Sequence, residues 1–482
     1  MNECLAGFQG AFLWPSDDFF MMSRTKGLAA ILILISAAIV YAIPPTGSLG
    51  KEGIRAASLV VLAVGFWATG VLPEHHTALL FLLLSVICKV APASIVFSGF
   101  HSSAVWLVFG GLVLAVSVKT TGLGLRMAHW LLDFFGTSYA AVITGVVVLA
   151  VLFSFFIPST LGRVVLLVPI VTAMAERLGF SEGTPGHDGM VMASTLACYV
   201  PSCAVLPSNV PNMVAAGAAE SLYKISFSYA EYLKLHFPVT GLLKSIAIIV
   251  LILTLFPDRI RSACSDPKRK GEPFSPQERI LTLILSLTLV LWGTDSLHGV
   301  SPAWVALAGA LLCMLPFVKL FPDGDFGRAI NLAPFFYVAG VVGLGAVVAN
   351  TGIGNLVGRE LIEKIGFEPG RDVRNFFSLV ILSTALGPLT TAPGLPAVFT
   401  PLSADLATAT GFPLVTVLMT QVVGFSTILF PYQSPPVVVG MQLGKVKAGK
   451  GVRTTLALAV VSILILMPIN YLWWALLGVF EH

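Results

Sequence analysis

WLVFGGLVLAVSVKTTGLGLRMAHWLLDFFG, at Trp106–Gly136, has a counterpart in the second half of the chain, FYVAGVVGLGAVVANTGIGNLVGRELIEKIG, at Phe336–Gly366. The two segments align without gaps, and each contains a Thr-Gly-x-Gly turn, at Thr121–Gly124 and at Thr351–Gly354. Self-similarity at this scale indicates an internal structural repeat; chance similarity between glycine-rich membrane helices is the alternative. We therefore expect two halves with the same order of elements.

The composition around this repeat is that of a membrane protein. Hydrophobic residues make up 56% of the 482 residues, charged residues make up 11%, and the mean hydropathy is +0.91. A soluble domain carries about 25% charged residues. The apolar runs provide about eleven spans of the roughly 20 residues that a helix needs to cross a bilayer. We predict an all-α polytopic membrane protein in a bacterial inner membrane, with the lipid bilayer and no nucleic acid as a partner.

Basic residues gather in three regions that the positive-inside rule assigns to the cytoplasm. They precede the first span at Arg24 and Lys26, occupy a linker at 257–279, and precede the last span at 445–453. An even number of spans must then separate these regions. We predict a cytoplasmic N-terminus and, one span after the last basic cluster, an external C-terminus.

The same pattern divides the chain into four parts. Residues 1–25 contain no span-length apolar run, and we expect them to be disordered, interfacial or a start-site artefact. Residues 26–256 hold the first span and the first repeat, 257–279 form the cytoplasmic linker, and 280–482 form the second repeat. If each half has an odd number of spans, the two repeats have inverted topology.

Each half also contains two interruptions rich in proline and small polar residues. The first pair is Ile157–Arg163 (IPSTLGR) and Leu386–Gly394 (LGPLTTAPG), and we expect these to be the tips of two re-entrant hairpins. The second pair is Leu206–Asn212 (LPSNVPN) and Phe430–Pro436 (FPYQSPP), which we expect to interrupt two spans. A helix broken inside the membrane leaves N–H and C=O groups unpaired, and each costs several kcal/mol in hydrocarbon. Paired interruptions in inverted repeats are typical of a transporter's binding site.

The chemistry of these interruptions indicates an anion. The N-terminal ends of half-helices carry free N–H donors and partial positive charge. Ordinary proline kinks with local polar repair are the alternative. We predict one site at the membrane midplane, lined by Ser159, Thr160, Arg163, Ser208, Asn209, Asn212, Thr390, Thr391 and Ser434.

Arg163 is the strongest candidate for a functional residue in this set. The helix after the first interruption is expected to run to about Arg177, so Arg163 lies well inside the hydrocarbon region. An arginine there is costly and by default functional. It can hold a carboxylate or sulfate in a bidentate fork. A structural ion pair with Asp133 or Asp405, or snorkelling to the interface, is the alternative.

Motifs for other functions are absent from the chain. It contains no G-x-x-x-x-G-K-[ST], so an ATP-driven motor is not encoded. It contains no H-E-x-x-H, and we find no intramembrane-protease or transferase constellation. We therefore expect a secondary transporter with no cofactor, and not an enzyme. A membrane enzyme or a non-transporting sensor on the same fold is the alternative from another class.

Most of residues 26–482 resemble the divalent-anion:sodium symporter (DASS) family of the ion-transporter superfamily. The resemblance rests on Thr121–Arg126, the interrupted segments, Asn209–Asn212 and Ser434–Pro436, the last two being similar to the family's Thr-Pro-Pro-Asn turns. It implies a homodimer whose transport domain moves as an elevator against a scaffold domain. It also implies symport or exchange of a small divalent anion, foremost a di- or tricarboxylate, with sulfate or another inorganic anion as the alternative.

The chain departs from the family pattern at the hairpin tips. The resemblance implies a Ser-Asn-Thr motif at each tip, but Ser159–Leu161 and Thr391–Pro393 stand there, and both asparagines are missing. A sodium site would then lie near Ser208 and Gln433, and sodium or a proton would be the coupling ion. We expect Arg163 to replace at least part of the sodium charge.

Overall fold

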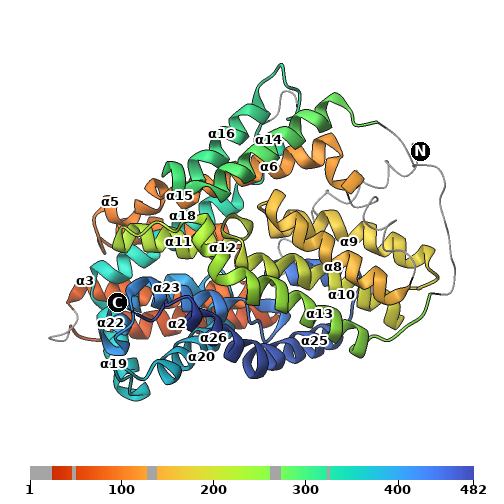
Figure 1. Ribbon diagram of the computed structural model, residues 1–482. Helices are drawn as coiled ribbons and strands as arrows, with labels where there is room; N and C mark the ends of the chain where they lie inside the picture. The colour runs from red at the N-terminus through yellow and green to blue at the C-terminus, as the bar shows by residue number, and fades with distance from the viewer. Residues whose placement is uncertain (1–23, 46–49, 128–137, 261–272, 323–325, 482) are drawn as a thin grey trace.

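The computed structural model describes residues 24–45, 50–127, 138–260, 273–322 and 326–481, and within these ranges the regular secondary structure is entirely helical. The helices pack together and cross at several angles (Figure 1). The first half contains α2 (Arg24–Tyr41), α3 (Lys51–Thr69), α4 (Glu74–Ile87), α5 (Ala93–Val96), η2 (Ser98–His101), α6 (Ser103–Thr121), α8 (Tyr139–Phe156), α9 (Thr160–Arg177), α10 (Pro185–Tyr199), η3 (Pro201–Ala204), η4 (Leu206–Ser208), α11 (Val210–Tyr223), α12 (Tyr229–His236), η5 (Phe237–Leu243) and α13 (Lys244–Leu255).

The second half repeats this order without a counterpart of α2. It contains α14 (Pro276–Gly293), α15 (Asp295–His298), α16 (Pro302–Met314), α17 (Phe326–Ala329), α18 (Ala333–Asn350), α19 (Ile353–Ile365), α20 (Asp372–Thr390), α21 (Leu395–Phe399), η7 (Thr400–Leu402), α22 (Ser403–Thr410), α23 (Leu414–Phe425), η8 (Pro431–Gln433), α24 (Pro435–Leu443), α25 (Ala448–Val461), η9 (Ser462–Leu466) and α26 (Met467–Leu476). In both halves a π-helical turn, η5 or η9, interrupts the last long helix.

In each half, one glycine-containing helix packs closely against a helix of the other half. α6 packs on α16 of the other half, and α18 packs on α4. A Cβ atom on Gly110 would lie 2.8 Å from the Ala306 carbonyl carbon, and one on Gly340 would lie 2.5 Å from Ala78 Cβ. These glycines are the ones that the sequence alignment pairs. A pseudo-twofold relation between the halves would produce this exchange.

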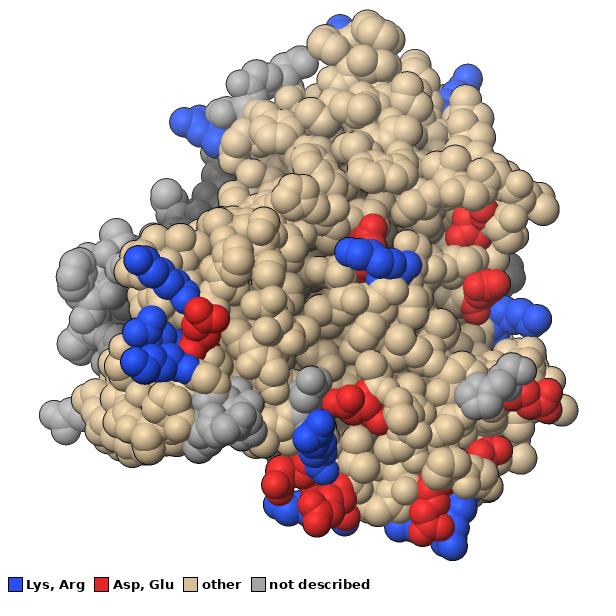
Figure 2. Space-filling model, turned by 90° about the vertical axis from the view of Figure 1, so that its left-hand side faces the viewer, with Lys and Arg blue, Asp and Glu red and all other residues tan. Residues whose placement is uncertain are grey.

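The outer surface of the bundle is apolar. Seven helices within the described residues are long and apolar enough to cross a membrane. Leucine and isoleucine side chains on the long helices are exposed, among them Leu32 on α2, Leu283 on α14 and Leu464 on η9. Figure 2 shows a face on which charged side chains are sparse and gather mainly towards its edges. Such a surface suits lipid, and the chain is a polytopic all-helical membrane protein, as the sequence predicts.

Polar contacts join three loops at one end of the molecule. Lys445 Nζ lies 2.6 Å from Glu182 Oε1, and Lys450 Nζ pairs with Asp188 Oδ2. The backbone N–H of Gly186 donates to the carboxylate of Asp258, at 2.9 Å. The start of the 257–279 linker and the basic segment at 445–453 therefore lie at the same end. The orientation of that end relative to the membrane remains a prediction, and residues 1–23 lie outside the described residues.

Candidate functional site

The first interruption separates α8 from α9 by three residues, Ile157–Ser159. The Ser159 side chain caps α9 by accepting a hydrogen bond from the Gly162 N–H at 3.1 Å. α9 then runs to Arg177, the end that the sequence predicts. Pro158 lies against α6, because a Cβ on Gly111 would lie 2.8 Å from Pro158 Cγ. The segment between α8 and α9 is thus held against α6.

Arg163 is fully buried on the first turn of α9. Its Nη1 donates to the carbonyl oxygens of Ile157 and Ser208, the second at 3.1 Å. Its Nη2 donates to the Cys198 carbonyl at 2.8 Å and to Thr160 Oγ1 at 3.1 Å. The guanidinium therefore joins the segment between α8 and α9 to the end of α10 and to η4.

These contacts change what Arg163 can do. Four of its five N–H donors are committed to protein oxygens, and only Nε has no partner. The expected bidentate fork is thus not available to a substrate in this conformation. Asp405 is not its partner, and Asp133 lies outside the described residues. The guanidinium is instead surrounded by three backbone carbonyl oxygens and the Thr160 hydroxyl.

The second interruption of the first half lies between α10 and α11. Asn209 caps α11, because its Oδ1 accepts from the Asn212 N–H at 3.1 Å. Its Nδ2 donates to Ser202 Oγ and Cys203 Sγ, both at 3.2 Å. Asn212 Nδ2 donates to the Val205 carbonyl at 2.9 Å. Both asparagines therefore shape the interruption itself.

The corresponding residues of the second half also lie together. The Ala392 N–H donates to the Gln433 carbonyl at 2.8 Å, which ties the break after α20 to the break after α23. Gln433 Oε1 accepts from the N–H groups of Leu429 and Phe430. Thr391 has a φ of 61°, in the left-handed region, and Thr390 Oγ1 donates to backbone carbonyls.

In addition to Arg163, four of the predicted site residues carry buried polar atoms without any hydrogen-bond partner in the protein. These atoms are Ser208 Oγ, Asn212 Oδ1, Thr391 Oγ1 and Ser434 Oγ. A buried polar group without a partner costs about 1–3 kcal/mol. Such groups are normally satisfied by water, an ion or a ligand. Two of these atoms belong to the first half and two to the second, and all four lie in the interruptions where the sequence predicts a ligand.

The interrupted helices of the two halves meet near the centre of the molecule. The Tyr199 hydroxyl, at the end of α10, donates to the Phe425 carbonyl at the end of α23, at 2.7 Å. α24 packs against both α9 and α10. The structure thus groups Ser159, Thr160 and Arg163 with Ser208, and groups Thr390 and Thr391 with the Gln433–Ser434 turn. That all nine residues line one cavity stays a prediction.

One buried cation was missed by the sequence analysis. Lys244, 2% exposed, begins α13 within a 27-residue apolar span, Tyr229–Leu255. The rule that singled out Arg163, that an ionisable residue inside a membrane span is functional by default, applies equally to it. Lys244 stands at the start of a long apolar run, so its position inside the span was not recognised from the sequence. No cluster of three metal-ligating side chains (His, Cys, Asp or Glu) occurs among the residues that the structure describes.

Comparison with known proteins agrees with this geometry. Residues 24–480 match the family model described as the sodium:sulfate symporter transmembrane region. The chain belongs to this family. It is therefore a multi-pass secondary transporter of anions and not an enzyme.

Several curated relatives of this symporter-family chain carry transporter names. The sodium-dependent dicarboxylate transporter SdcS of Staphylococcus saprophyticus is 20% identical, over 88% of this chain and 86% of the relative. The chloroplastic dicarboxylate transporter 1 of Spinacia oleracea is 23% identical over 58% of this chain, and the match spans only 51% of that relative. The putative malate transporter YflS of Bacillus subtilis is 23% identical, over 64% of this chain and 66% of the relative.

Solved structures support the fold alone. The YdaH transporter of Alcanivorax borkumensis aligns with a TM-score of 0.51 at 14% identity, over 94% of this chain and 98% of that one. MtrF of Neisseria gonorrhoeae aligns with a TM-score of 0.52 at 13% identity, over 94% of this chain and 96% of MtrF.

Proposed function

We propose that this protein carries a small divalent anion, a di- or tricarboxylate, across the membrane by an elevator-type movement within a homodimer. The names of SdcS, YflS and the chloroplastic relatives support a dicarboxylate. The family description supports sulfate as the second candidate. The domain movement and the dimer follow from the family resemblance.

The observation that carries the proposal is the group of unpartnered polar atoms in the paired interruptions. Ser208 Oγ, Thr391 Oγ1 and Ser434 Oγ can each donate a hydrogen bond that the protein does not use. Hydrogen bonds to a charged group contribute about 1.5–3 kcal/mol each. A small anion with several oxygens would therefore satisfy these donors together.

The coupling follows from the fixed charge of Arg163. A dianion needs positive charge nearby when it leaves water. Arg163 holds its charge against the carbonyls of Ile157, Cys198 and Ser208, and it cannot leave with the substrate. The empty carrier then keeps an unneutralised charge and returns reluctantly. We propose anion exchange that needs no sodium, with a co-transported proton as the only route to net uptake.

Two measurements test this function. Purified protein should be stabilised thermally by malate, succinate or citrate, more than by sulfate or phosphate, and equally in sodium and choline salts. Proteoliposomes loaded with the best ligand should take up the labelled ligand in choline medium, and unloaded liposomes should take up much less. Steep, saturable dependence of uptake on sodium would refute the coupling. Absence of binding by every anion tested would refute the substrate class.

A further inference from the structure

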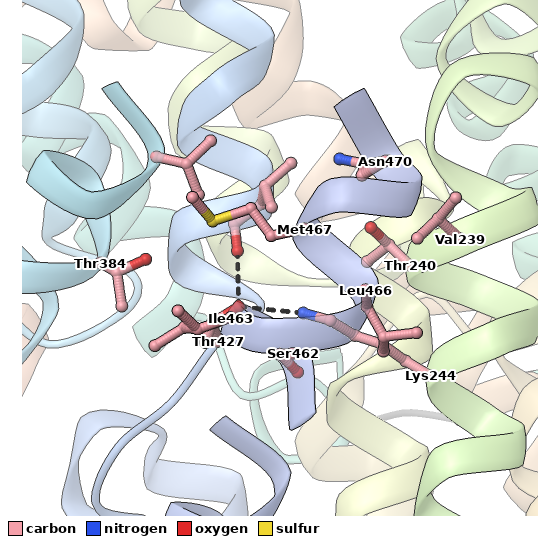
Figure 3. A pocket seen from close by; sticks show the side chains of 12 residues that line it. Val239, Thr240, Lys244, Thr384, Thr427, Ser462, Ile463, Leu466, Met467 and Asn470 are labelled. Carbon is pink, nitrogen blue, oxygen red and sulfur yellow. Dashed lines mark hydrogen bonds between the residues drawn. The ribbon is translucent and has the colours of Figure 1, made fainter. Parts of the chain in front are cut away.

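Lys244 is held in a manner similar to Arg163, but its partners belong to the second half of the chain. Its Nζ donates to the Ser426 carbonyl at 3.1 Å, to Ser426 Oγ at 2.8 Å and to Thr427 Oγ1 at 3.0 Å. Figure 3 shows the lysine side chain directed at Thr427 and joined to it by a hydrogen bond. Ser426 and Thr427 directly follow α23 and precede the second interruption of the second half, Phe430–Pro436.

The three acceptors around Lys244 match the donors of an ammonium group. Ser426 Oγ and Thr427 Oγ1 lie within hydrogen-bond distance of the Val423 carbonyl, at 3.0 Å and 2.8 Å, and can donate to it. Each hydroxyl oxygen can then accept from Lys244, as the Ser426 carbonyl does. An ammonium group has three protons for these three acceptors, whereas a neutral amine has only two. The geometry therefore fits the charged form of Lys244.

Both buried cations lie at the C-terminal end of an interrupted helix. Arg163 donates to the Cys198 carbonyl in the last turn of α10, and Lys244 donates to the Ser426 carbonyl just beyond α23. The C-terminal end of a helix carries partial negative charge and unpaired carbonyls, which favour a cation. The two ends meet through the hydrogen bond from Tyr199 to Phe425.

Packing places Lys244 near the second interruption of the first half. Cys203, in η3, accepts a hydrogen bond from Asn209 Nδ2 at 3.2 Å. η3, which contains Cys203, packs directly against η5, the turn that precedes Lys244. The second cation therefore lies beside the interruption that carries Ser208, Asn209 and Asn212.

Neither cation is neutralised by the protein. Among the residues that the structure describes, no carboxylate forms an ion pair with Arg163 or Lys244. A buried charge without a counter-ion is strongly unfavourable. Two tethered positive charges call for two negative charges, which a dianion supplies and a monoanion does not.

We infer that Lys244 is a second fixed cation of the anion site and that, together with Arg163, it sets the preference for a doubly charged substrate. This inference rests on the proposed function and adds a determinant of substrate charge. The cavity beside Lys244, about 10 Å³, holds one water molecule at most, so it is not itself the substrate site. Asn470, Thr384 and Ser462 line it, with unpartnered side-chain polar atoms.

The test compares two ligands of one shape and different charge. Binding of malate, a dianion at pH 7.5, and of malamate, its singly charged monoamide, is measured by calorimetry on the purified full-length protein. Wild type should bind malate at least tenfold more tightly than malamate. Lys244→Met should lose at least tenfold in malate affinity and much less in malamate affinity. Lys244→Arg, which keeps the charge, should retain the preference.

Lys234→Met is the matched control, because Lys234 is exposed on α12 of the same long helix. It should bind both ligands as wild type does. A Lys244→Met variant with the wild-type ratio of affinities would overturn the inference. Wild type that binds malate and malamate equally well would overturn it even if the variant does not fold. Wild type that binds no dianion at all would instead refute the proposed function.

Discussion

Removing a single hydroxyl group from an interruption should change ligand affinity without lowering the stability of the protein. Ser208 Oγ and Ser434 Oγ are buried and have no partner, so Ser208→Ala and Ser434→Ala remove no hydrogen bond from the empty protein. The free energy of unfolding should stay unchanged or rise, because an unsatisfied buried hydroxyl costs about 1–3 kcal/mol. Malate affinity should nevertheless fall about tenfold in each variant, since one hydrogen bond to a charged ligand is lost. Thermal melts with and without malate measure both quantities.

Ser58→Ala provides the contrast. Ser58 Oγ is buried on α3 and donates to the Ala37 carbonyl at 2.7 Å. This variant should lose stability by about 1 kcal/mol and bind malate normally. Lower stability together with unchanged affinity in Ser208→Ala and Ser434→Ala would show that these hydroxyls serve the fold.

Substitutions of Arg163 can test its positive charge and its hydrogen-bond geometry separately. Arg163→Lys keeps the positive charge but offers three donors in place of five, so it cannot reach Ile157, Cys198 and Ser208 together with Thr160. Malate binding should weaken by at least tenfold yet remain detectable, whereas Arg163→Ala should abolish it. Arg177→Lys, at the exposed end of α9, should bind as wild type. Normal affinity in Arg163→Ala would remove this residue from the site.

At the scale of whole elements, the exchange of helices between the halves depends on two glycines. Gly110→Ala and Gly340→Ala would place a Cβ within 3.0 Å of Ala306 or Ala78 on the crossing helix. Each should lower the free energy of unfolding by about 1–3 kcal/mol, because the helices must move apart. Gly345→Ala, also on α18, meets its nearest neighbour at 3.8 Å. That control should be neutral or stabilising, since alanine favours a helix by about 1 kcal/mol. Melting temperatures in detergent compare the three variants.

At the scale of the whole molecule, the open question is which end faces the cytoplasm. Lys445 and Lys450 lie at the same end as Asp258, where the 257–279 linker begins. The positive-inside rule places that end in the cytoplasm. A variant that keeps Cys264, in the linker, as its single cysteine should resist an impermeant maleimide in intact cells and react after permeabilisation. Labelling in intact cells would reverse the topology, with a cysteine placed near the C-terminus as the opposite control.

The sequence by itself determined the class of the protein, its internal repeat and the four interruptions. These are local properties, because a span is a run of apolar residues and an interruption is a cluster of proline, glycine and short polar side chains. The end of α9 at Arg177 and the burial of Arg163 followed from the same local reasoning. Family membership agrees with the resemblance seen in the Thr121–Gly124 turn and the Asn209–Asn212 segment.

Only the tertiary structure decided which groups the buried cations contact. The carbonyl partners of Arg163 include Cys198 and Ser208, 35 and 45 residues away along the chain, and the carbonyl partner of Lys244, Ser426, lies 182 residues away. Backbone carbonyls are present at every residue, so no residue type marks the ones that a cation will meet. Which carbonyls converge depends on where the helices end and how the halves pack, and that arrangement made Arg163 a tethered cation and brought Lys244 beside the second interruption.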